Sequence, residues 1–581
     1  ALTFSKSSVR SRVHRQAYSD YIIVKRYDTQ GKVCGESRFL GLYTSSVYTF
    51  SPYNIPLIRQ KMTHVLQRSG LDLRSHSGKQ LQQVLETFPR DELFLSNSSE
   101  LFETASSVAD INERYRVRLF MRKDPYGKFV TAVIYIPRDI FNTRTRIRIQ
   151  EMLSDAINAK ELEFTTHFSE SILARVHVVF RIDPSDAVEF NVAKLERRVI
   201  DLAKTWDDVL RDAIVESCGE ESGLRLFQAY SEGFCSAYRD SYDGRSAVHD
   251  IARIETLSDE QSIAMSFYRP AGVDNNIVRF KVFHRNSLVE LSDVVPVLEH
   301  LGLRVMGEQP YKIQESNGRD IYLHDFYLRS DLNTDIVIQT VKEHFQQAFE
   351  AIWFKYTDSD AFNRLVIGAR LDWREVAVLR AYARYMKQTA FNFSQSYIAG
   401  TLANHLDITR NLVALFKSKF DPKINKGGAK ELQRIERLHR KIIDSLEQVQ
   451  SLNEDQVIRR YVEMIEGTLR TNFFRKNETG KNRDFISLKL APRNIDNIPE
   501  PRPLFEIFVY SPRVEGVHLR GGKVARGGLR WSDRLQDYRT EVLGLVKAQQ
   551  VKNAVIVPSG AKGGFVAKRL PNASNREEFM A

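Results

Sequence analysis

Two glycine pairs, each next to basic residues, lie close together near the C-terminal end of the sequence. Gly527–Gly528 lies between Arg526 and Arg530, and Gly563–Gly564 directly follows Lys562. Glycine has no Cβ and lets a backbone come close to a ligand, while guanidinium and ammonium groups hold carboxylates in charge-assisted hydrogen bonds. Because no cluster of metal ligands is evident nearby, the pattern predicts a cationic pocket, without a metal, for a small dicarboxylate.

Lys562 is the residue of this group best suited to proton transfer. A lysine on a rigid glycine-rich loop, beside other cations and partly removed from water, can become a neutral amine, since desolvation and like charges both disfavour the ammonium form. A neutral amine can move a proton or hydrogen-bond a polarised carbonyl. A second interpretation stays open, in which Arg526, Arg530 and Lys552 form a solvated basic face and the glycine pairs are structural.

The local pattern predicts the elements that hold these residues. Ser532 is expected to be the N-cap of a helix that runs to about Val551 and has Lys552 at its C-terminal end. A short apolar strand over 554–557 and a glycine-rich loop over 559–564, which carries Lys562, are expected to follow.

Other motif interpretations fit this stretch less well. The P-loop pattern GxxxxGK[ST] is missing, and the aromatic residues that could stack on bases are limited to Trp531 and Phe565. The net charge of +12, from 85 basic and 73 acidic residues, permits nucleic acid but equally suits an enzyme of anionic metabolites. We therefore expect no nucleic-acid partner. We also expect no membrane partner, because no stretch approaches the ~18 apolar residues of a membrane-spanning helix.

The cysteines and the two ends of the sequence also carry information. Cys34, Cys218 and Cys235 form no CxxC pair and no disulfide framework, which favours a reducing compartment and hence a cytoplasmic location. The sequence starts at Ala1 and stops abruptly after EEFMA, so we expect a fragment of a longer protein.

Alternating and helical patterns run through the first 242 residues. The predicted elements are strands at Tyr21–Tyr27 and Val33–Tyr43, a helix at Ile55–Leu71, strands at Tyr115–Met121 and Phe129–Ile136, a helix at Thr143–Ala159, strands at Leu162–Phe168 and Ala174–Asp183, and helices over 193–242.

Two later regions have a clearer organisation. Residues 277–353 predict strand, helix, strand, strand, helix, which is a ferredoxin-like pattern short of its last strand. Residues 372–464 predict a helical bundle, in which Leu432, Ile442 and Leu446 share one apolar face. Strands are predicted again at Phe485–Leu490 and Leu504–Tyr510.

The segment ARGGLRWSDRLQDYRTEVLGLVKAQQVKNAVIVPSGAKGGF resembles the substrate-binding segment of glutamate dehydrogenases. It is most similar to the large NAD-specific bacterial class, whose chains carry long N-terminal regulatory extensions. The resemblance is strong over 520–566, with weaker echoes at DYIIVKRYD, REVAVLRAYARYMKQ and NEDQVIRRYVEMIEGTLRTNFF.

The resemblance assigns roles by position. Lys562 resembles the catalytic lysine that polarises the 2-oxo group, and Lys552 the lysine that binds the substrate's α-carboxylate. Arg526 lies where smaller members have a lysine facing a substrate carboxylate, and the Lys552–Lys562 spacing is slightly shorter than theirs. With Arg530, the glycines Gly527, Gly528, Gly563 and Gly564 complete the expected substrate-binding set. The family's catalytic aspartate and NAD-binding residues are expected beyond Ala581.

The resemblance also implies the activity and the fold class. The expected full-length enzyme is an NAD-specific glutamate dehydrogenase that converts L-glutamate to 2-oxoglutarate and ammonium, forms a homo-oligomer and binds an amino-acid effector at ACT-like domains, while the isolated fragment is inactive. The alternative is a non-catalytic ACT-type region for amino-acid sensing or assembly. The expected fold class is α+β multidomain, with ferredoxin/ACT-like sandwiches, a helical bundle linker and the first part of a substrate domain.

Six domains are expected: an α+β N-terminal regulatory domain at 1–105, an ACT-like domain at 106–190, a helical connecting segment at 191–265, an ACT-like domain at 266–355, a helical bundle at 356–480 and the start of the catalytic domain at 481–581.

Overall fold

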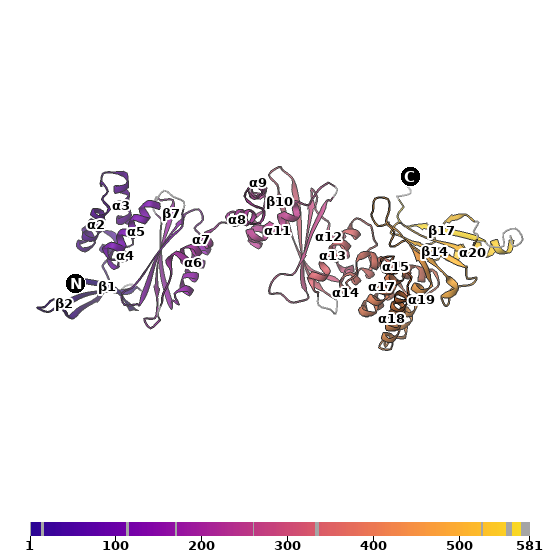
Figure 1. Cartoon of the computed structure of the whole chain (residues 1–581). Helices are drawn as coiled ribbons and strands as arrows, with labels where there is room; N and C mark the ends of the chain where they lie inside the picture. Colours follow the sequence, from indigo (N-terminus) through magenta and orange to yellow (C-terminus); the bar gives the residue numbers. More distant parts are fainter. Residues whose placement is uncertain are drawn as a thin grey trace. The chain divides into compact units, whose positions relative to one another are not determined.

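The computed structural model describes residues 2–12, 17–111, 116–168, 171–186, 188–259, 261–331, 336–523, 527–552 and 560–570. The chain divides into two compact units, Ala1–Ala213 and Ile214–Ala581 (Figure 1). Helices and sheets alternate along both units, as expected for a multidomain α+β chain.

The first unit begins with a three-stranded antiparallel sheet, β1 (Leu2–Arg10), β2 (Tyr18–Tyr27) and β3 (Val33–Gly41), in that order. The hairpin β2–β3 was predicted from its alternation, but β1 was not. The inward-facing part of β1 is largely polar: its Lys6 is buried and pairs with Asp20 at 3.0 Å and Asp91 at 2.9 Å. An apolar/polar pattern cannot reveal a strand that buries charged residues.

Five helices follow: α1 (Ser45–Thr49), α2 (Pro56–Ser69), α3 (His76–Thr87), α4 (Arg90–Leu95) and α5 (Ser98–Ile111). The predicted helix at Ile55–Leu71 is confirmed as α2. Ile58, Met62 and Val65 are fully buried in a core shared with α3 and α5, because residues three and four apart share one helix face.

Two modules with the same order of elements, ββαββα, account for the sheet structure between β3 and the C-terminal sheet. The first consists of β4 (Arg118–Lys123), β5 (Phe129–Pro137), α6 (Thr143–Ala156), β6 (Glu161–Phe168), β7 (Leu173–Arg181) and α7 (Val192–Ala203). The second consists of β8 (Ile263–Tyr268), β9 (Ile277–Arg285), α12 (Leu291–His300), β10 (Leu303–Gln314), β11 (Asp320–Ser330) and α13 (Ile338–Trp353).

Both sheets are antiparallel and have equivalent strand orders, β4-β5-β7-β6 and β8-β9-β11-β10. The ferredoxin-like pattern predicted over 277–353 therefore does have a fourth strand. β8 precedes the pattern and pairs with β9, from Ile263 opposite His284 to Tyr268 opposite Arg279. The outer position that a closing C-terminal strand would occupy in a ferredoxin-like fold is filled from the N-terminal side in both modules.

The helices α8 (Trp206–Cys218), α9 (Glu220–Tyr230), α10 (Ser236–Ser241) and α11 (Gly244–Ile254) separate the two modules in sequence. Side chains of α10 and α11 cover the face of the second sheet that lies away from α12 and α13. Lys281 of β9 donates to Asp250 of α11 at 2.5 Å, and the hydroxyl of Tyr238 donates to the same carboxylate at 2.6 Å.

The predicted helical region contains α14 (Leu365–Gly368), α15 (Trp373–Gln388), α16 (Gln395–Asn404), α17 (Leu406–Phe420), α18 (Ala429–Leu446) and α19 (Leu452–Gly467). On α18, Ile442 and Leu446 are buried as predicted, but Leu432 is 60% exposed. The apolar stripe therefore packs only along the C-terminal part of this helix.

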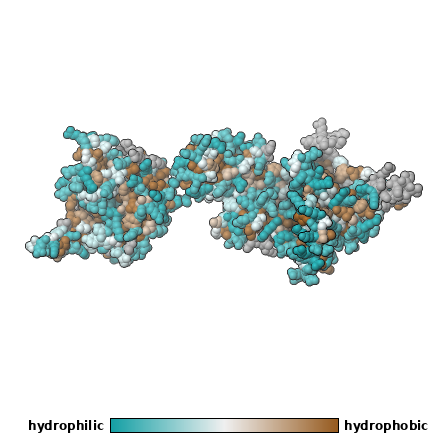
Figure 2. All heavy atoms as spheres, in the orientation of Figure 1, coloured by the Kyte–Doolittle hydropathy of each residue, from teal (hydrophilic) through white to brown (hydrophobic). Residues whose placement is uncertain are grey.

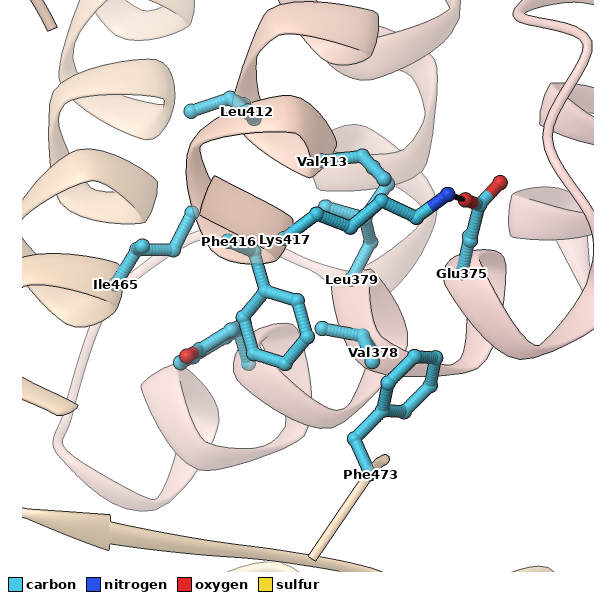
Figure 3. A pocket seen from close by; sticks show the side chains of 10 residues that line it. Glu375, Val378, Leu379, Leu412, Val413, Phe416, Lys417, Ile465 and Phe473 are labelled. Carbon is cyan, nitrogen blue, oxygen red and sulfur yellow. Dashed lines mark ion pairs between the residues drawn. The ribbon is translucent and has the colours of Figure 1, made fainter. Parts of the chain in front are cut away.

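Figure 3 shows the packed interior between α15, α17 and α19, where the Phe416 ring lies beside Val378. An ion pair between Lys417 and Glu375 lies at one side of a cavity of about 10 Å³. A void of that size holds at most about one water molecule, so it is a packing gap.

Among the described residues, the C-terminal sheet has six strands in the order β12-β13-β14-β15-β17-β16. Their bounds are Thr468–Thr471 (β12), Ile486–Leu490 (β13), Phe505–Tyr510 (β14), Val514–Arg520 (β15), Leu529–Trp531 (β16) and Ala561–Ala567 (β17), and α20 spans Tyr538–Lys552. Neighbouring strands are antiparallel except β16 and β17, which are parallel.

The surface matches the charged composition. Figure 2 shows mainly hydrophilic residues on the visible face of both units. Within the described ranges, no helix combines the length and the apolar character needed to cross a membrane.

Candidate active site

Lys562 lies on β17, a strand inside the C-terminal sheet and not the glycine-rich loop predicted for 559–564. It pairs with Leu519 of β15, and the next residue, Gly563, pairs with His518 on one side and Leu529 on the other. The prediction was wrong because two neighbouring strands, distant in sequence, provide backbone partners for this glycine-rich segment. Glycine is tolerated in a strand where other parts of the protein approach closely.

The glycines of both pairs lie where protein atoms come close. A Cβ on Gly564 would lie 2.4 Å from Val542 of α20, and one on Gly527 would lie 1.5 Å from the Ala561 carbonyl oxygen. Gly563 donates its N–H to the Gly528 carbonyl at 3.3 Å. The two pairs predicted from sequence are therefore brought together, and packing alone already requires glycine at Gly527 and Gly564.

The contact between Gly564 and Val542 shows that α20 covers the face of β17 that carries the even-numbered residues. Because side chains alternate along a strand, Lys562 projects from the same face. Its side chain is half-buried, and Gly527 lies directly beside its Cδ atom. Within the described residues it makes no hydrogen bond or ion pair, so its ammonium group is available to an anionic or carbonyl ligand.

Arg530 lies on the same face, paired with Gly564 across β16 and β17. Its side chain is 57% exposed and forms an ion pair with Glu541 of α20 at 2.5 Å. Sequence reasoning missed Glu541, which also accepts a hydrogen bond from the Ser532 hydroxyl at 2.6 Å. Arg530 therefore already has a carboxylate partner, which a substrate carboxylate would have to displace or share.

The helix of the site begins later than predicted. α20 starts at Tyr538, so Ser532 is not its N-cap. The N–H of Ser532 donates to the Phe565 carbonyl at 2.9 Å, which prolongs the pairing of β16 with β17 before the chain turns into the helix. Strand pairing overrides the local capping preference of serine.

Lys552 is the last residue of α20. Gln549, three residues earlier, lies against Gly560 at the start of β17, so the C-terminal end of the helix is at the Lys562 end of the strand. The side chain of Lys552, the whole of Arg526 and the predicted strand at 554–557 lie outside the described residues.

A buried ion pair that the sequence did not reveal holds α20 in place. Arg539 of α20 donates to Glu506 of β14 at 2.7 and 2.9 Å, and both side chains are almost fully buried. Burial alone would lower the pKa of Arg539, but the Glu506 carboxylate outweighs it and the pKa is raised. The sequence did contain one indication of this pair. Glu506 alternates with the same period of two as Phe508 and Tyr510, whose side chains face inward.

Gln388 at the end of α15 forms a second anchor. Its amide nitrogen donates to the Leu535 carbonyl at 3.0 Å, and its amide oxygen accepts from the Arg539 N–H at 3.2 Å. The helical region thereby positions the first turn of α20.

A further cluster connects the end of β17 to the segment after α13. Lys568 pairs with Asp358 at 3.0 Å and with Glu515 of β15 at 3.1 Å. The Tyr510 hydroxyl also donates to Asp358 at 2.7 Å. Burial by itself raises the pKa of Asp358, but Lys568 and Tyr510 outweigh that effect and lower it. The exit from the second module and the strand of Lys562 therefore share a buried charge cluster.

The described site has two cations, Lys562 and Arg530, on the neighbouring strands β17 and β16. Across the described part of the chain, no group of three or more His, Cys, Asp or Glu side chains is arranged to hold a metal ion. Cations on a sheet can bind carboxylates, and a half-buried one such as Lys562 can stabilise negative charge that develops on a carbonyl oxygen.

Comparison with known families assigns these elements. Residues 441–581 match the model described as bacterial NAD-glutamate dehydrogenase, catalytic domain, and 118–207 and 262–341 match the glutamate dehydrogenase ACT2 and ACT3 domains. Residues 55–114, 213–257 and 357–422 match glutamate dehydrogenase helical motifs 1, 2 and 3.

The chain belongs to the bacterial NAD-glutamate dehydrogenase family. It is 49% identical over 576 residues to the NAD-specific glutamate dehydrogenase of Halomonas elongata. The aligned region covers 99% of this chain and 35% of that protein. It is 48% identical over 581 residues to the enzyme of that name from Pseudomonas aeruginosa and 36% identical over 591 residues to the one from Mycobacterium tuberculosis. These matches cover 100% and 98% of this chain, and 36% of each relative.

The comparisons confirm the predicted fold class. ACT domains and helical motifs precede a catalytic domain, in the order expected from the resemblance of the C-terminal segment. The chain spans about a third of the length of the relatives it matches.

Proposed function

We propose that this chain takes part in the NAD-dependent oxidative deamination of L-glutamate to 2-oxoglutarate and ammonium. The observation that carries the proposal is the position of Lys562 within the segment that matches the family's catalytic domain. Its side chain is half-buried on the α20 face of the sheet and has no partner among the described residues.

Lys562 is the proposed catalytic residue. Its backbone is fixed by pairing with β15 and β16, and its amine, at the end of a flexible side chain, can hydrogen-bond the 2-oxo group and move a proton in the water and ammonia steps. Lys552, Arg526 and Arg530 are the proposed carboxylate ligands. The proposal gives the four glycines the role of letting the backbone approach the substrate closely: Gly527, Gly528, Gly563 and Gly564. The close protein contacts of Gly527 and Gly564 support this role.

Dinucleotide binding is not assigned to residues of this chain. The sequence has no G-x-G-x-x-G fingerprint, the motif that would place a pyrophosphate at a helix N-terminus. When bound, NAD supplies hydride acceptance, while the cations named above orient the substrate.

The test is Lys562→Ala in the protein that contains this chain. We expect NADH formation from glutamate to be lost while the thermal unfolding midpoint stays close to that of the wild type. Lys552→Ala should mainly raise the Michaelis constant for glutamate. An unchanged turnover number in the Lys562 variant would remove the proposed catalytic role.

Regulation, assembly and domain limits belong to the same proposal. An amino-acid effector is proposed for the ACT domains, together with a homo-oligomeric, cytoplasmic enzyme and the six domain ranges given above. The alternative, a non-catalytic amino-acid sensing or assembly region, is supported by the two matches to ACT domains. Calorimetry with a panel of amino acids separates the two sites, because effector binding at an ACT domain should survive Lys562→Ala.

A further inference from the structure

A cavity of about 490 Å³ lies away from Lys562, where the segment after α13 meets α15 and the C-terminal sheet. It is lined by residues 356–357, the first turn of α15, the loop between β12 and β13, and the turn 510–512. Ligand sites for small molecules usually enclose about 300–1,000 Å³, so the cavity is large enough for one.

The charges around the cavity are mainly positive. Arg374, Lys476, Lys481 and Arg483 line it, and Asp484 is the one acidic lining residue in the described part of the chain. The Asp484 carboxylate is paired with Arg513 at 2.5 Å, which partly neutralises it. The lining therefore favours a negatively charged ligand.

Arg374 is the cation placed deepest. Its guanidinium group donates to the Phe473 carbonyl at 2.9 Å and lies 4.3 Å from the centre of the Phe473 ring. Among the described residues no carboxylate lies within ion-pair distance of it. Burial lowers the pKa of Arg374, although the nearby Asp372 acts in the opposite direction. A half-buried cation without an ionic partner is stabilised when an anion binds beside it.

Aromatic side chains provide the remaining walls. Trp373 of α15 and Phe485, directly before β13, are partly buried and both line the cavity, while Tyr356 is 61% exposed. Flat aromatic faces next to cations suit a ligand that has a planar ring at one end and negative charge at the other.

We propose that this cavity binds a nucleoside phosphate, with the phosphate near Arg374 and the loop cations and the base between Trp373 and Phe485. The site goes beyond the proposed glutamate chemistry and does not depend on it. Its lining includes Tyr510, whose hydroxyl donates to Asp358 in the cluster that contains Lys568. A ligand here would therefore touch the link between the second module and the strand of Lys562.

Calorimetry on the 581-residue chain tests the proposal with AMP, adenosine, inorganic pyrophosphate and NAD as probes. We expect AMP to bind, and adenosine and pyrophosphate each to bind more weakly, because each provides only half of the contacts. Arg374→Gln should weaken AMP binding by about tenfold, the effect of losing a charge-assisted hydrogen bond. Lys481→Gln combined with Arg483→Gln should have a similar effect.

The matched control is Lys430→Gln, which removes one exposed charge from α18, outside the cavity. It should leave AMP affinity unchanged, and thermal unfolding should show that all variants are folded. AMP affinity that is unaffected by the Arg374 and loop variants would overturn the proposal. So would binding of pyrophosphate as tight as that of AMP, because the ring would then contribute nothing.

Tryptophan fluorescence tests independently where AMP binds. The chain has four tryptophans, so AMP should quench the fluorescence of the wild type, and Trp373→Phe should abolish the quenching while largely keeping the affinity. Quenching that persists in this variant would place the ligand elsewhere. NAD binding that is tighter than AMP binding and insensitive to Arg374→Gln would assign adenylate recognition to another site and contradict the proposal. Because no turnover is measured, these outcomes are separate from those of Lys562→Ala.

Discussion

The two ββαββα modules have one topology but bury the second face of their sheets in different ways. In the first module, Val133, Tyr135 and Leu173 pack into an apolar core with α2, α3 and α5. In the second, the corresponding face carries Lys281 and Arg279, which pair with Asp250 and Asp325. The second face also buries apolar residues, among them Leu323 and Ile313. The two modules therefore differ in the buried Lys281–Asp250 pair that the second one adds between its sheet and α11, and strand order does not decide this difference.

The ionic attachment of the second module is deeply buried. Lys281 and Asp250 have side-chain exposures of 4% and 5%, and the Lys281 ammonium lies 3.6 Å from the centre of the Tyr242 ring. Buried ion pairs contribute little net stability but cost much when one partner is lost. We infer that the Lys281–Asp250 pair selects one arrangement of the helical motif on the sheet, while the apolar contacts of both modules provide most of the stability.

The first module also has a buried ionic cluster beside its apolar core. Glu92 of α4 accepts from Arg122 at 3.2 Å and lies 3.2 Å from the His177 ring nitrogen. Burial alone would raise the pKa of Glu92, but Arg122 and His177 outweigh it and the pKa is lowered. For Asp250 burial dominates, and the pKa is raised in spite of Lys281 and Tyr238.

The largest expected effect comes from breaking the buried pair of the second module. Lys281→Ala should destabilise it by about 3–5 kcal/mol, because Asp250 is left buried without a cation. Hydrogen exchange of peptides from β9 and β11, followed by mass spectrometry, measures the effect in this module alone. The double variant Lys281→Met with Asp250→Leu should recover much of the loss. No recovery would show that the pair does more than specify the arrangement.

A somewhat smaller loss is expected from the apolar face of the first module. Leu173→Ala truncates a side chain that is 4% exposed. It should lower the free energy of unfolding of the first module by about 2–4 kcal/mol, because apolar burial is lost and a cavity is left behind. Hydrogen exchange of peptides from β5 and β7 measures this loss. A loss larger than that of Lys281→Ala would reverse the ranking of the two faces.

The two buried carboxylates should respond to pH with opposite sign. The folded-state pKa of Glu92 lies below its unfolded value of 4.5, so its contribution is present above that pH and is lost as the pH falls further. The folded-state pKa of Asp250 lies above its unfolded value of 3.8, so acidification through this range favours its folded state. Hydrogen-exchange protection of each module, measured between about pH 3 and 6, gives the sign of its pH dependence. The same measurement on Glu92→Gln and Asp250→Asn shows how much of it each carboxylate contributes. If the protection of both modules changed with pH in the same direction, the predicted difference between Glu92 and Asp250 would be wrong.

The smallest effect is expected at the surface of the second module's helical cover. Arg245 and Glu216 form an ion pair at 3.1 Å, with both side chains about two-thirds exposed, at 67% and 68%. Arg245→Ala should change stability by less than about 0.5 kcal/mol, within the error of a denaturant titration. A loss as large as that of Lys281→Ala would mean that this surface pair contributes as much to the attachment as the buried pair.

Much of the secondary structure was predictable because its cause is local. The alternation in β2 and β3, the apolar runs of β5 and β7, and the apolar face of α2 depend on residues within a few positions of one another. The glycine and lysine pattern of the C-terminal segment, with its resemblance to glutamate dehydrogenases, indicated the family before any fold was known. These features were written in residue types and spacing.

What the tertiary structure decided involves partners distant in the sequence. β8 closes its sheet by pairing with β9, the segment of Lys562 is a strand because β15 and β16 flank it, and α20 starts at Tyr538 because Ser532 still pairs with β17. The pairing of Arg539 with Glu506 follows the same principle. Local pattern determines which conformation a segment prefers, but hydrogen bonds and buried charges need partners, and only the folded chain brings these partners together.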